Sequence, residues 1–218
     1  MAAMTVPLVR ALTELHSTYR SFPARTRVHV LGRFLTCPFL AVVGEIPAGA
    51  RVLEIGAGHG IFAFLAAANG ARRVVAVDPD LRKSLPSFHH PAVRFVAGFD
   101  DAVAGRFDVV AMIDVLYKVP LPEWDALFAR VFERLVPGGV FLLKELDPDR
   151  RVRASWNRAQ ESVASVLGLT LGRSFAYETP VVMRRRLQRA GFVGLRARPL
   201  GRWYPHAHVL YSAHRPRA

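Results

Sequence analysis

Three glycines that alternate with other residues are the clearest candidates for chemistry in this sequence. Gly56, Gly58 and Gly60 stand in the segment Val52–Ala63, between a short apolar run that favours a strand and one that favours a helix. Glycine adopts positive φ angles at little cost and leaves no Cβ between the backbone and a bound molecule. The segment, including Ala57, is therefore predicted to be a ligand-binding loop.

An acidic residue ends the next β-branched run, Arg73–Val77. Asp78 stands 22 positions beyond Gly56, the separation at which a carboxylate on the neighbouring strand accepts hydrogen bonds from both hydroxyls of a ribose. Asp78 also precedes Pro79, so it could cap a helix as well. The ribose interpretation predicts a cofactor that contains adenosine.

Two cofactor classes fit a glycine loop with a ribose acid. Gly58–Ala63 satisfies the G-x-G-x-x-A form of the dinucleotide fingerprint, which would indicate a nicotinamide oxidoreductase, but a single match of this kind is a weak signal. Glu54 lies inside the strand that leads into the loop, two residues before Gly56. This acid and the glycines, with Asp78 on the next strand, resemble the class I S-adenosylmethionine-dependent methyltransferase family.

The resemblance covers roughly residues 48 to 146. Phe107–Tyr117 looks like the family's fourth strand, and Leu135–Lys144 looks like its turn into the fifth. The resemblance implies that Glu54 orients the loop and the amino-acid end of S-adenosyl-L-methionine, that the loop glycines pass under its methionine part, and that Asp78 binds its ribose. It assigns Asp100 to the adenine amino group and Phe99 to a ring contact. The other implied cofactor contacts are Pro79, Ile113 and Asp114.

Polar and aromatic residues near the predicted strand ends are candidates for the acceptor site, because open α/β sheets bind ligands at the carboxyl ends of their strands. Three side chains could accept a proton: His59 in the loop, Glu145 after the fifth strand, and His206 in the Trp203–His208 cluster. An imidazole ionises near neutral pH. Candidate acceptor contacts are Tyr117, Lys118, Asp147, Trp156 and Tyr204. For each of these residues, capping, surface exposure or the start of a strand is the alternative.

The segment before the first predicted strand favours helices. Met4–Tyr19 has apolar residues near helical spacing, and Val28–Val43 is apolar with an interruption at Pro38, which predicts a helix, a break and a short helix. Small-molecule methyltransferases commonly carry a helical lid here, so the resemblance implies that residues 1–47 cover the cofactor and the acceptor. Tyr19 and Arg20 are expected to contact the acceptor, with simple packing as the alternative.

Short apolar runs alternate with helical segments from residue 51 onward, which indicates a parallel sheet covered on both faces. The expected strands are Val52–Ile55, Arg73–Val77, Val93–Val96, Phe107–Ile113, Val140–Lys144, Val193–Arg198 and His208–Ala213, the last two as an antiparallel hairpin. Helices are expected to begin near Gly60, Asp80, Pro122 and Asp149, and one is expected over Thr179–Ala190. The predicted fold is doubly wound α/β, a Rossmann-like, mostly parallel seven-stranded sheet in a single domain. Its parts are the lid, a cofactor-binding core over 48–146 and a basic substrate-side region over 147–218.

Positive charge is concentrated in the last third of the chain. The net charge is +13, and residues 150–218 hold 14 arginines against Glu161 and Glu178. Such a segment favours an anionic partner: nucleic acid, an anionic membrane surface, an acidic carrier protein or an anionic substrate. A solvated, arginine-rich surface is the alternative.

Other features restrict the class of protein. Cys37 is the only cysteine, which excludes an internal disulfide and a cysteine-cluster metal site, and no metal is predicted. No apolar run approaches the roughly 20 residues needed to span a bilayer. The N-terminal residues lack the pattern of a signal peptide, so a cytoplasmic protein is expected.

These patterns predict a stand-alone methyltransferase that acts on an oxygen of a small or carrier-bound metabolite. The Lys144-Glu-Leu-Asp and Tyr-Pro-His stretches loosely resemble methyltransferases of bacterial pigment and other natural-product pathways. An RNA methyltransferase and a non-enzymatic module that binds through the basic C-terminal face are the alternatives. Against an RNA methyltransferase, no Asn/Asp-Pro-Pro-aromatic tetrapeptide follows the fourth strand. A mechanism that uses two cysteines is also excluded, because the sequence has only one.

Overall fold

The computed structural model describes residues 7–83, 90–99, 103–146, 178–201, 204 and 207–217. Three helices precede the sheet: α1 (Leu8–Tyr19), α2 (Ala24–Thr36) and α3 (Phe39–Val43). A proline stands immediately before each of them, where its missing N–H costs no helical hydrogen bond. The expected helix, break and short helix are confirmed, with the break at Cys37 and Pro38.

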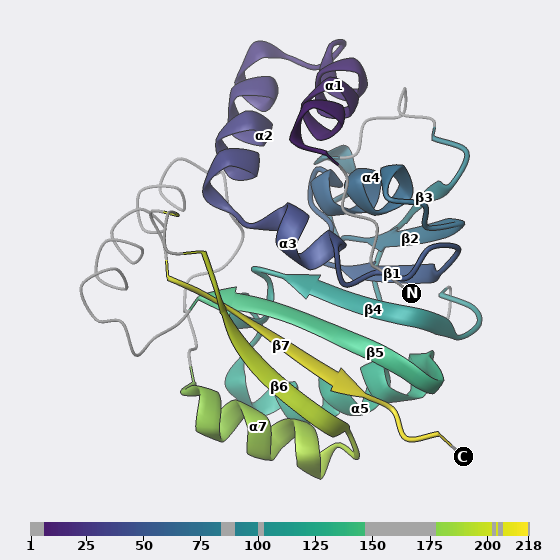
Figure 1. Cartoon of the computed structure of the whole chain (residues 1–218), viewed down its shortest axis with the longest axis vertical. Coiled ribbons are helices and arrows are strands. Elements are labelled where there is room, and N and C mark those ends of the chain that lie inside the picture. The colour runs from purple at the N-terminus through teal and green to yellow at the C-terminus, as the bar shows by residue number, and fades with distance from the viewer. Residues whose placement is uncertain are drawn as a thin grey trace.

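Seven strands form one sheet in the order β3-β2-β1-β4-β5-β7-β6. The strands are β1 (Arg51–Ile55), β2 (Arg73–Val77), β3 (Val93–Val96), β4 (Phe107–Ile113), β5 (Leu135–Leu146), β6 (Val193–Leu200) and β7 (His208–His214). Neighbours from β3 to β5 pair in parallel, whereas β7 is antiparallel to both β5 and β6. The predicted doubly wound, mostly parallel, Rossmann-like sheet with an antiparallel end hairpin is therefore confirmed (Figure 1).

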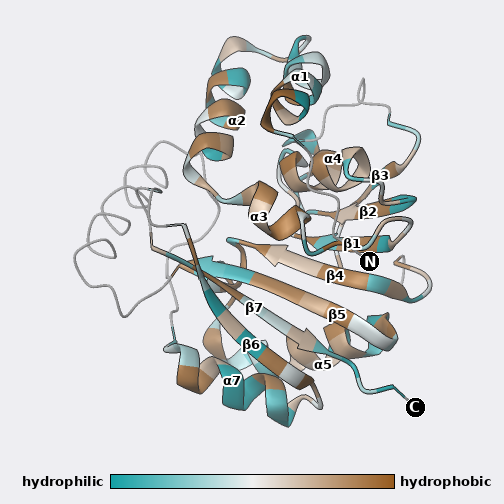
Figure 2. Ribbon diagram, in the orientation of Figure 1, coloured by the Kyte–Doolittle hydropathy of each residue, from teal (hydrophilic) through white to brown (hydrophobic). Residues whose placement is uncertain are grey.

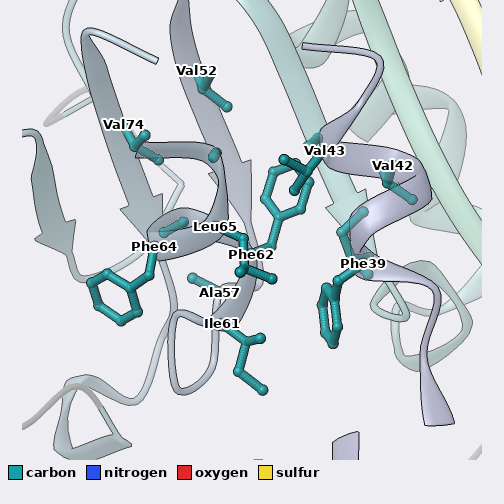
Figure 3. Close-up of a cluster of buried hydrophobic side chains, with 14 of the residues drawn as sticks. Phe39, Val42, Val43, Val52, Ala57, Ile61, Phe62, Phe64, Leu65 and Val74 are labelled. Carbon is teal, nitrogen blue, oxygen red and sulfur yellow. The ribbon is translucent and has the colours of Figure 1, made fainter. Parts of the chain in front are cut away.

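Successive strand residues point to opposite faces, and helices cover both of them. Helices α1 to α4 (α4, Ile61–Ala68) enclose one apolar cluster, and α5 (Trp124–Arg134) and α7 (Pro180–Arg189) enclose the other. Figure 3 shows α3 and α4 meeting in the first cluster, where Phe62 points toward Val43. Hydrophobic colour dominates the centre of β4 and β5 in Figure 2, whereas α7 alternates between hydrophobic and hydrophilic residues, as expected of a surface helix.

Several elements differ from the expected boundaries: α2 begins at Ala24 rather than Val28, and β6 ends at Leu200 rather than Arg198. Strand β5 begins at Leu135 rather than Val140, because the backbone of Gly138 and Gly139 pairs with Arg215 beyond β7 instead of forming an isolated turn. The described part of the helix expected near Asp80 is one 3₁₀ turn, η1 (Leu81–Lys83). The helix expected near Asp149 lies outside the described residues.

Candidate functional site

The glycine loop joins β1 to α4 at the carboxyl edge of the sheet. Gly56, Gly58 and Gly60 have φ angles of 78°, 54° and 79°, and the N–H groups of Gly56 and Ala57 both donate to the Val77 carbonyl. A Cβ on Gly56 would lie 2.3 Å from a methyl of Val115, whereas a Cβ on Gly58 would meet open space. Packing therefore requires glycine at position 56, and Gly58 leaves the backbone accessible to a ligand.

Asp78 ties the end of β2 to this loop. Its buried carboxylate accepts hydrogen bonds from the N–H of Gly58 at 2.7 Å and of Asp80 at 2.9 Å, and Lys83 Nζ lies 3.6 Å away. Each carboxylate oxygen can accept a second bond. Asp78 thus caps the turn at Pro79, and it also stands beside the open face of Gly58, where the ribose interpretation requires it.

Glu54 lies beneath the loop and is almost fully buried. Burial raises the pKa of its carboxyl well above the usual range, and the negative charge of Asp78 adds to this, while the N–H of Ala63 opposes it. Its Oε2 atom has no hydrogen-bond partner within the described part of the chain. A buried carboxyl with an unpartnered oxygen beside an open glycine loop fits a ligand that supplies a hydrogen-bond partner there.

Helices α1 and α2 contact the loop at His59. The Tyr19 hydroxyl donates to the His59 carbonyl at 2.5 Å, and the ring of His29 lies 5.1 Å from the ring of His59. Burial, together with the charges of His29 and Lys83, lowers the pKa of His59 to about 4, and burial with the charge of Arg33 lowers that of His29. Both rings are therefore neutral at physiological pH.

Three charged groups meet where β4 and β5 end, and we name them the Arg33–Asp114–Lys144 cluster. Asp114 accepts from Nη2 of Arg33 at 2.8 Å and from Nζ of Lys144, whose side chain is completely buried. Burial would raise the pKa of Asp114, but the charges of Lys144 and Arg33 outweigh it and hold this pKa well below its usual range. Helix α2 is thus joined to the end of β4 by an ion pair.

Glu145 fixes the turn that follows β4. Its Oε1 atom accepts from the N–H of Val115 at 3.1 Å and of Leu116 at 2.7 Å. Burial and the nearby charge of Asp114 raise the pKa of Glu145 to about 8. Since Val115 packs against Gly56, this carboxyl connects the turn after β4 with the glycine loop.

Further side chains surround the Arg33–Asp114–Lys144 cluster. Cys37 is buried beside this cluster, and burial raises the pKa of its thiol to about 11. His208 at the start of β7 lies 3.0 Å from the Thr36 carbonyl through Nε2, and the ring of Tyr204 packs edge-on against His208 at 5.9 Å. The cluster is therefore assembled from α2 and the ends of β4 and β5, and residues near β7 pack around it.

The other predicted site residues occupy varied positions. Ile113 ends β4 and is buried, and Tyr117 is buried below Lys118, whose Nζ lies 5.1 Å from its ring centre. Phe99 packs under the Arg130 guanidinium at 4.4 Å, and Arg20 is exposed at the end of α1. Four predicted residues lie outside the described part: Asp100, Asp147, Trp156 and His206.

Two lid residues at the site, His29 and Arg33, were not singled out from the sequence. They stand four positions apart in α2, so they share one face of the helix. The sequence signal that could have indicated them is a basic residue at helical spacing within an apolar segment.

A cavity of about 380 Å³ is lined by residues such as Asp108, Gly138 and His214 at the opposite edge of the sheet, and it contains none of the site residues.

Within the residues that the structure describes, no three His, Cys, Asp or Glu side chains are grouped so that they could hold a metal ion. Among the same residues, no helix has the length and apolar character needed to cross a membrane.

The chain matches the model of a family described as a methyltransferase domain, over residues 29–197. The match spans most of the chain, from α2 to β6, and includes the glycine loop, Asp78 and the Arg33–Asp114–Lys144 cluster. The chain belongs to this family, that of the class I methyltransferases, whose cofactor is S-adenosylmethionine. The resemblance noted in the sequence is thereby confirmed.

A curated methyltransferase is similar to part of this chain. The ribosomal protein L11 methyltransferase of Bordetella parapertussis is 37% identical over 103 residues, which cover 45% of this chain and 32% of that protein. The chain therefore spans about a third of the length of this curated relative.

Two solved structures share the fold. The human N-acetylserotonin methyltransferase in complex with S-adenosylmethionine superposes with a TM-score of 0.65 at 18% identity, covering 97% of this chain and 60% of that one. The 1,6-didemethyltoxoflavin-N1-methyltransferase of Burkholderia thailandensis, crystallised with 1,6-didemethyltoxoflavin and S-adenosylhomocysteine, gives 0.62 at 19% identity, covering 97% and 91%.

The residues around the glycine loop fit S-adenosylmethionine. Asp78 would hold its ribose hydroxyls, the open face of Gly58 would accommodate its methionine part, and the unused oxygen of the buried Glu54 would take a hydrogen bond from its polar groups. The bound cofactor supplies an activated methyl group on a sulfonium. The protein's own task is to hold the acceptor atom in line with it and to remove a proton where required.

Proposed function

We propose that this chain methylates an oxygen atom of a small or carrier-bound metabolite. The observation that carries the proposal is the set of contacts by which helices α1 and α2 are held against the glycine loop and the end of β4. Helices α1 and α2 contact the His59 backbone and ring, and α2 also pairs with the end of β4 through Arg33. A site flanked by helices in this way can enclose a small acceptor. It therefore suits a small acceptor better than it suits a folded macromolecule.

The proposal assigns proton transfer to residues beside the cluster. Glu145 has a raised pKa, and its Oε2 atom has no hydrogen-bond partner in the described structure, so it can exchange a proton near neutral pH. His59 remains a candidate, although its low pKa makes it a weak base. The same role for His206 stays a prediction from the sequence.

The basic last third of the chain supports a further part of the proposal, an anionic partner that delivers the acceptor. Arg184 and Arg185 are exposed on α7, whereas Arg186 is held by Glu178 and Asp125 with its guanidinium 5.8 Å from the Trp124 ring centre. Arg186 therefore stabilises the fold, and its two neighbours remain for an acidic carrier protein or an anionic membrane surface. RNA is the alternative partner.

A methyl-transfer screen tests the proposal. The protein is incubated with radiolabelled S-adenosylmethionine and with cell extract divided into small molecules, lipids, proteins and RNA, and Asp78→Ala serves as the matched control. We expect label in the small-molecule fraction, or on a carrier from which mild hydrolysis releases a small labelled product. Label that stays on RNA or on a protein side chain would contradict the proposed function.

A further inference from the structure

The charges of the Arg33–Asp114–Lys144 cluster do not balance. Two cations share one carboxylate, whereas the next carboxyl, Glu145, accepts from the N–H groups of Val115 and Leu116, and burial with the charge of Asp114 raises its pKa. Burial keeps the Cys37 thiol neutral as well. The described residues of this cluster therefore leave about one positive charge in excess, in surroundings from which much of the water is excluded.

Arg33 is the cation that a ligand can reach. The Lys144 side chain is completely buried, whereas that of Arg33 is 33% exposed. Arg33 uses only Nη2 in a hydrogen bond with the described residues, and its guanidinium lies 6.0 Å from the ring centre of Phe39. Since a guanidinium carries five N–H donors, most of them remain for an anionic oxygen.

The position of Arg33 relates it to the cofactor loop. His29 and Arg33 lie one helical turn apart on α2, at a spacing that brings Cβ atoms within about 5–6 Å. His29 packs on His59 of the glycine loop, while Arg33 reaches the end of β4. A group held by Arg33 therefore lies close to the loop that binds the methyl donor.

The backbone at Asp114 supports a functional role for the cluster. Asp114 has a φ of 56° and is the only non-glycine residue with positive φ in the described structure. Its N–H donates to the Lys144 carbonyl at 2.9 Å, and its carboxylate receives both cations. Such backbone conformations cost energy and concentrate at functional sites.

We propose that the acceptor is an acidic hydroxyl compound of the phenol or enol class, and that Arg33 binds its ionised oxygen beside the glycine loop. This inference rests on the proposed O-methylation. An excess positive charge favours the anion of such a hydroxyl, whose proton passes to the ionised form of Glu145 and from there to solvent before the transfer. The oxygen then forms the bond to the methyl carbon with its own electron pair, and the pair of the broken carbon–sulfur bond stays on sulfur.

The test uses 4-nitrophenol as the probe, because its anion absorbs visible light. The probe is titrated with pH in the presence of the protein saturated with S-adenosylhomocysteine. For wild type we expect the ionisation constant of the bound probe to rise about 10-fold or more, as an opposite charge within hydrogen-bond distance predicts. Arg33→Lys keeps the charge and should keep most of the shift, whereas Arg33→Gln should lose it.

Arg27→Gln is the matched control, because Arg27 is exposed on the same helix and should leave the shift unchanged. A wild-type complex that fails to bind the probe, binds it without a shift, or gives the same shift as Arg33→Gln would overturn the inference. Thermal melting checks that each variant folds. If S-adenosylhomocysteine binds but the shift is missing, only the acceptor class is wrong. If label from the screen appears on a nitrogen or on a macromolecule, the proposed function itself is wrong.

Discussion

The two halves of the carboxyl edge of the sheet are built in different ways. At the ends of β1 and β2, the glycine loop and Asp78 come from one short stretch of chain and are held mainly by backbone hydrogen bonds. At the ends of β4 and β5, side chains from α2 and from these two strand ends, which are far apart in the sequence, meet in a buried cluster of charges. The first half suits a constant cofactor, and the second can change with the acceptor.

The largest effect on the free energy of unfolding is expected from removing the charge of Asp114, the carboxylate that pairs with the cations of the second half. Asp114→Asn keeps a side chain that tolerates positive φ but leaves Lys144 buried without a carboxylate. We expect a loss of about 3–5 kcal/mol in the free energy of unfolding, measured by urea denaturation. Asp108→Asn is the control, since the Arg51–Asp108 pair is 35% exposed on both sides and should contribute only about 0–1 kcal/mol. Equal losses in the two variants would show that the cluster is not a buried charge centre.

The glycines of the first half should separate folding from binding. Gly56→Ala places a Cβ against Val115 and should lower the melting temperature. Gly58→Val meets no protein atom, so its folding cost should be limited to about 1–2 kcal/mol for the left-handed backbone, while binding of S-adenosylhomocysteine is abolished. Thermal melting with and without this ligand measures both effects. Gly58→Val protein that is stabilised by the ligand as strongly as wild type would contradict the position of the cofactor.

The fold and the glycine loop could be predicted from the sequence more fully than the Arg33–Asp114–Lys144 cluster. The parallel sheet, the end hairpin, the glycine loop and Asp78 were predictable, because apolar runs and glycines act over short stretches of chain. The cluster was predicted only in part. Asp114 was predicted as a cofactor contact rather than as an ion-pair partner, and Arg33 was not predicted, because its meeting with Asp114 joins residues 81 positions apart. Charge pairing over such a separation follows from the packing of α2 on the sheet and leaves no local pattern.

A pH-dependent effect should reveal the ionisation of Glu145. Its native pKa of about 8 lies above that of an unfolded carboxyl, so its contribution to stability is complete at low pH. The contribution is lost as the pH rises from about 4 to about 8, with a slope of up to about 1.4 kcal/mol per pH unit. Glu145→Gln keeps the acceptor for Val115 and Leu116 and should remove this slope in urea denaturation. Parallel stability curves for the two proteins would show that the carboxyl is ionised throughout.

The smallest effect is expected from the exposed arginines. Reversing Arg184 and Arg185 to Glu should change the affinity for S-adenosylhomocysteine by less than about twofold, because exposed charges beyond about 10 Å are screened by salt. The same variant should raise the KM for the acceptor found in the labelling screen, and added salt should do likewise. If neither reversal nor salt alters turnover of that acceptor, these arginines form only a solvated surface.

The division of the edge into a cofactor half and an acceptor half is tested most directly by calorimetric titration of S-adenosylhomocysteine into three proteins. Asp78→Ala removes a charge-assisted contact worth roughly 1.5–3 kcal/mol and should weaken binding about 10- to 150-fold relative to wild type. Arg33→Gln should stay within about threefold of wild type, about 0.7 kcal/mol, because Arg33 is assigned to the acceptor. Wild-type affinity in Asp78→Ala, or an equal loss in both variants, would contradict the account.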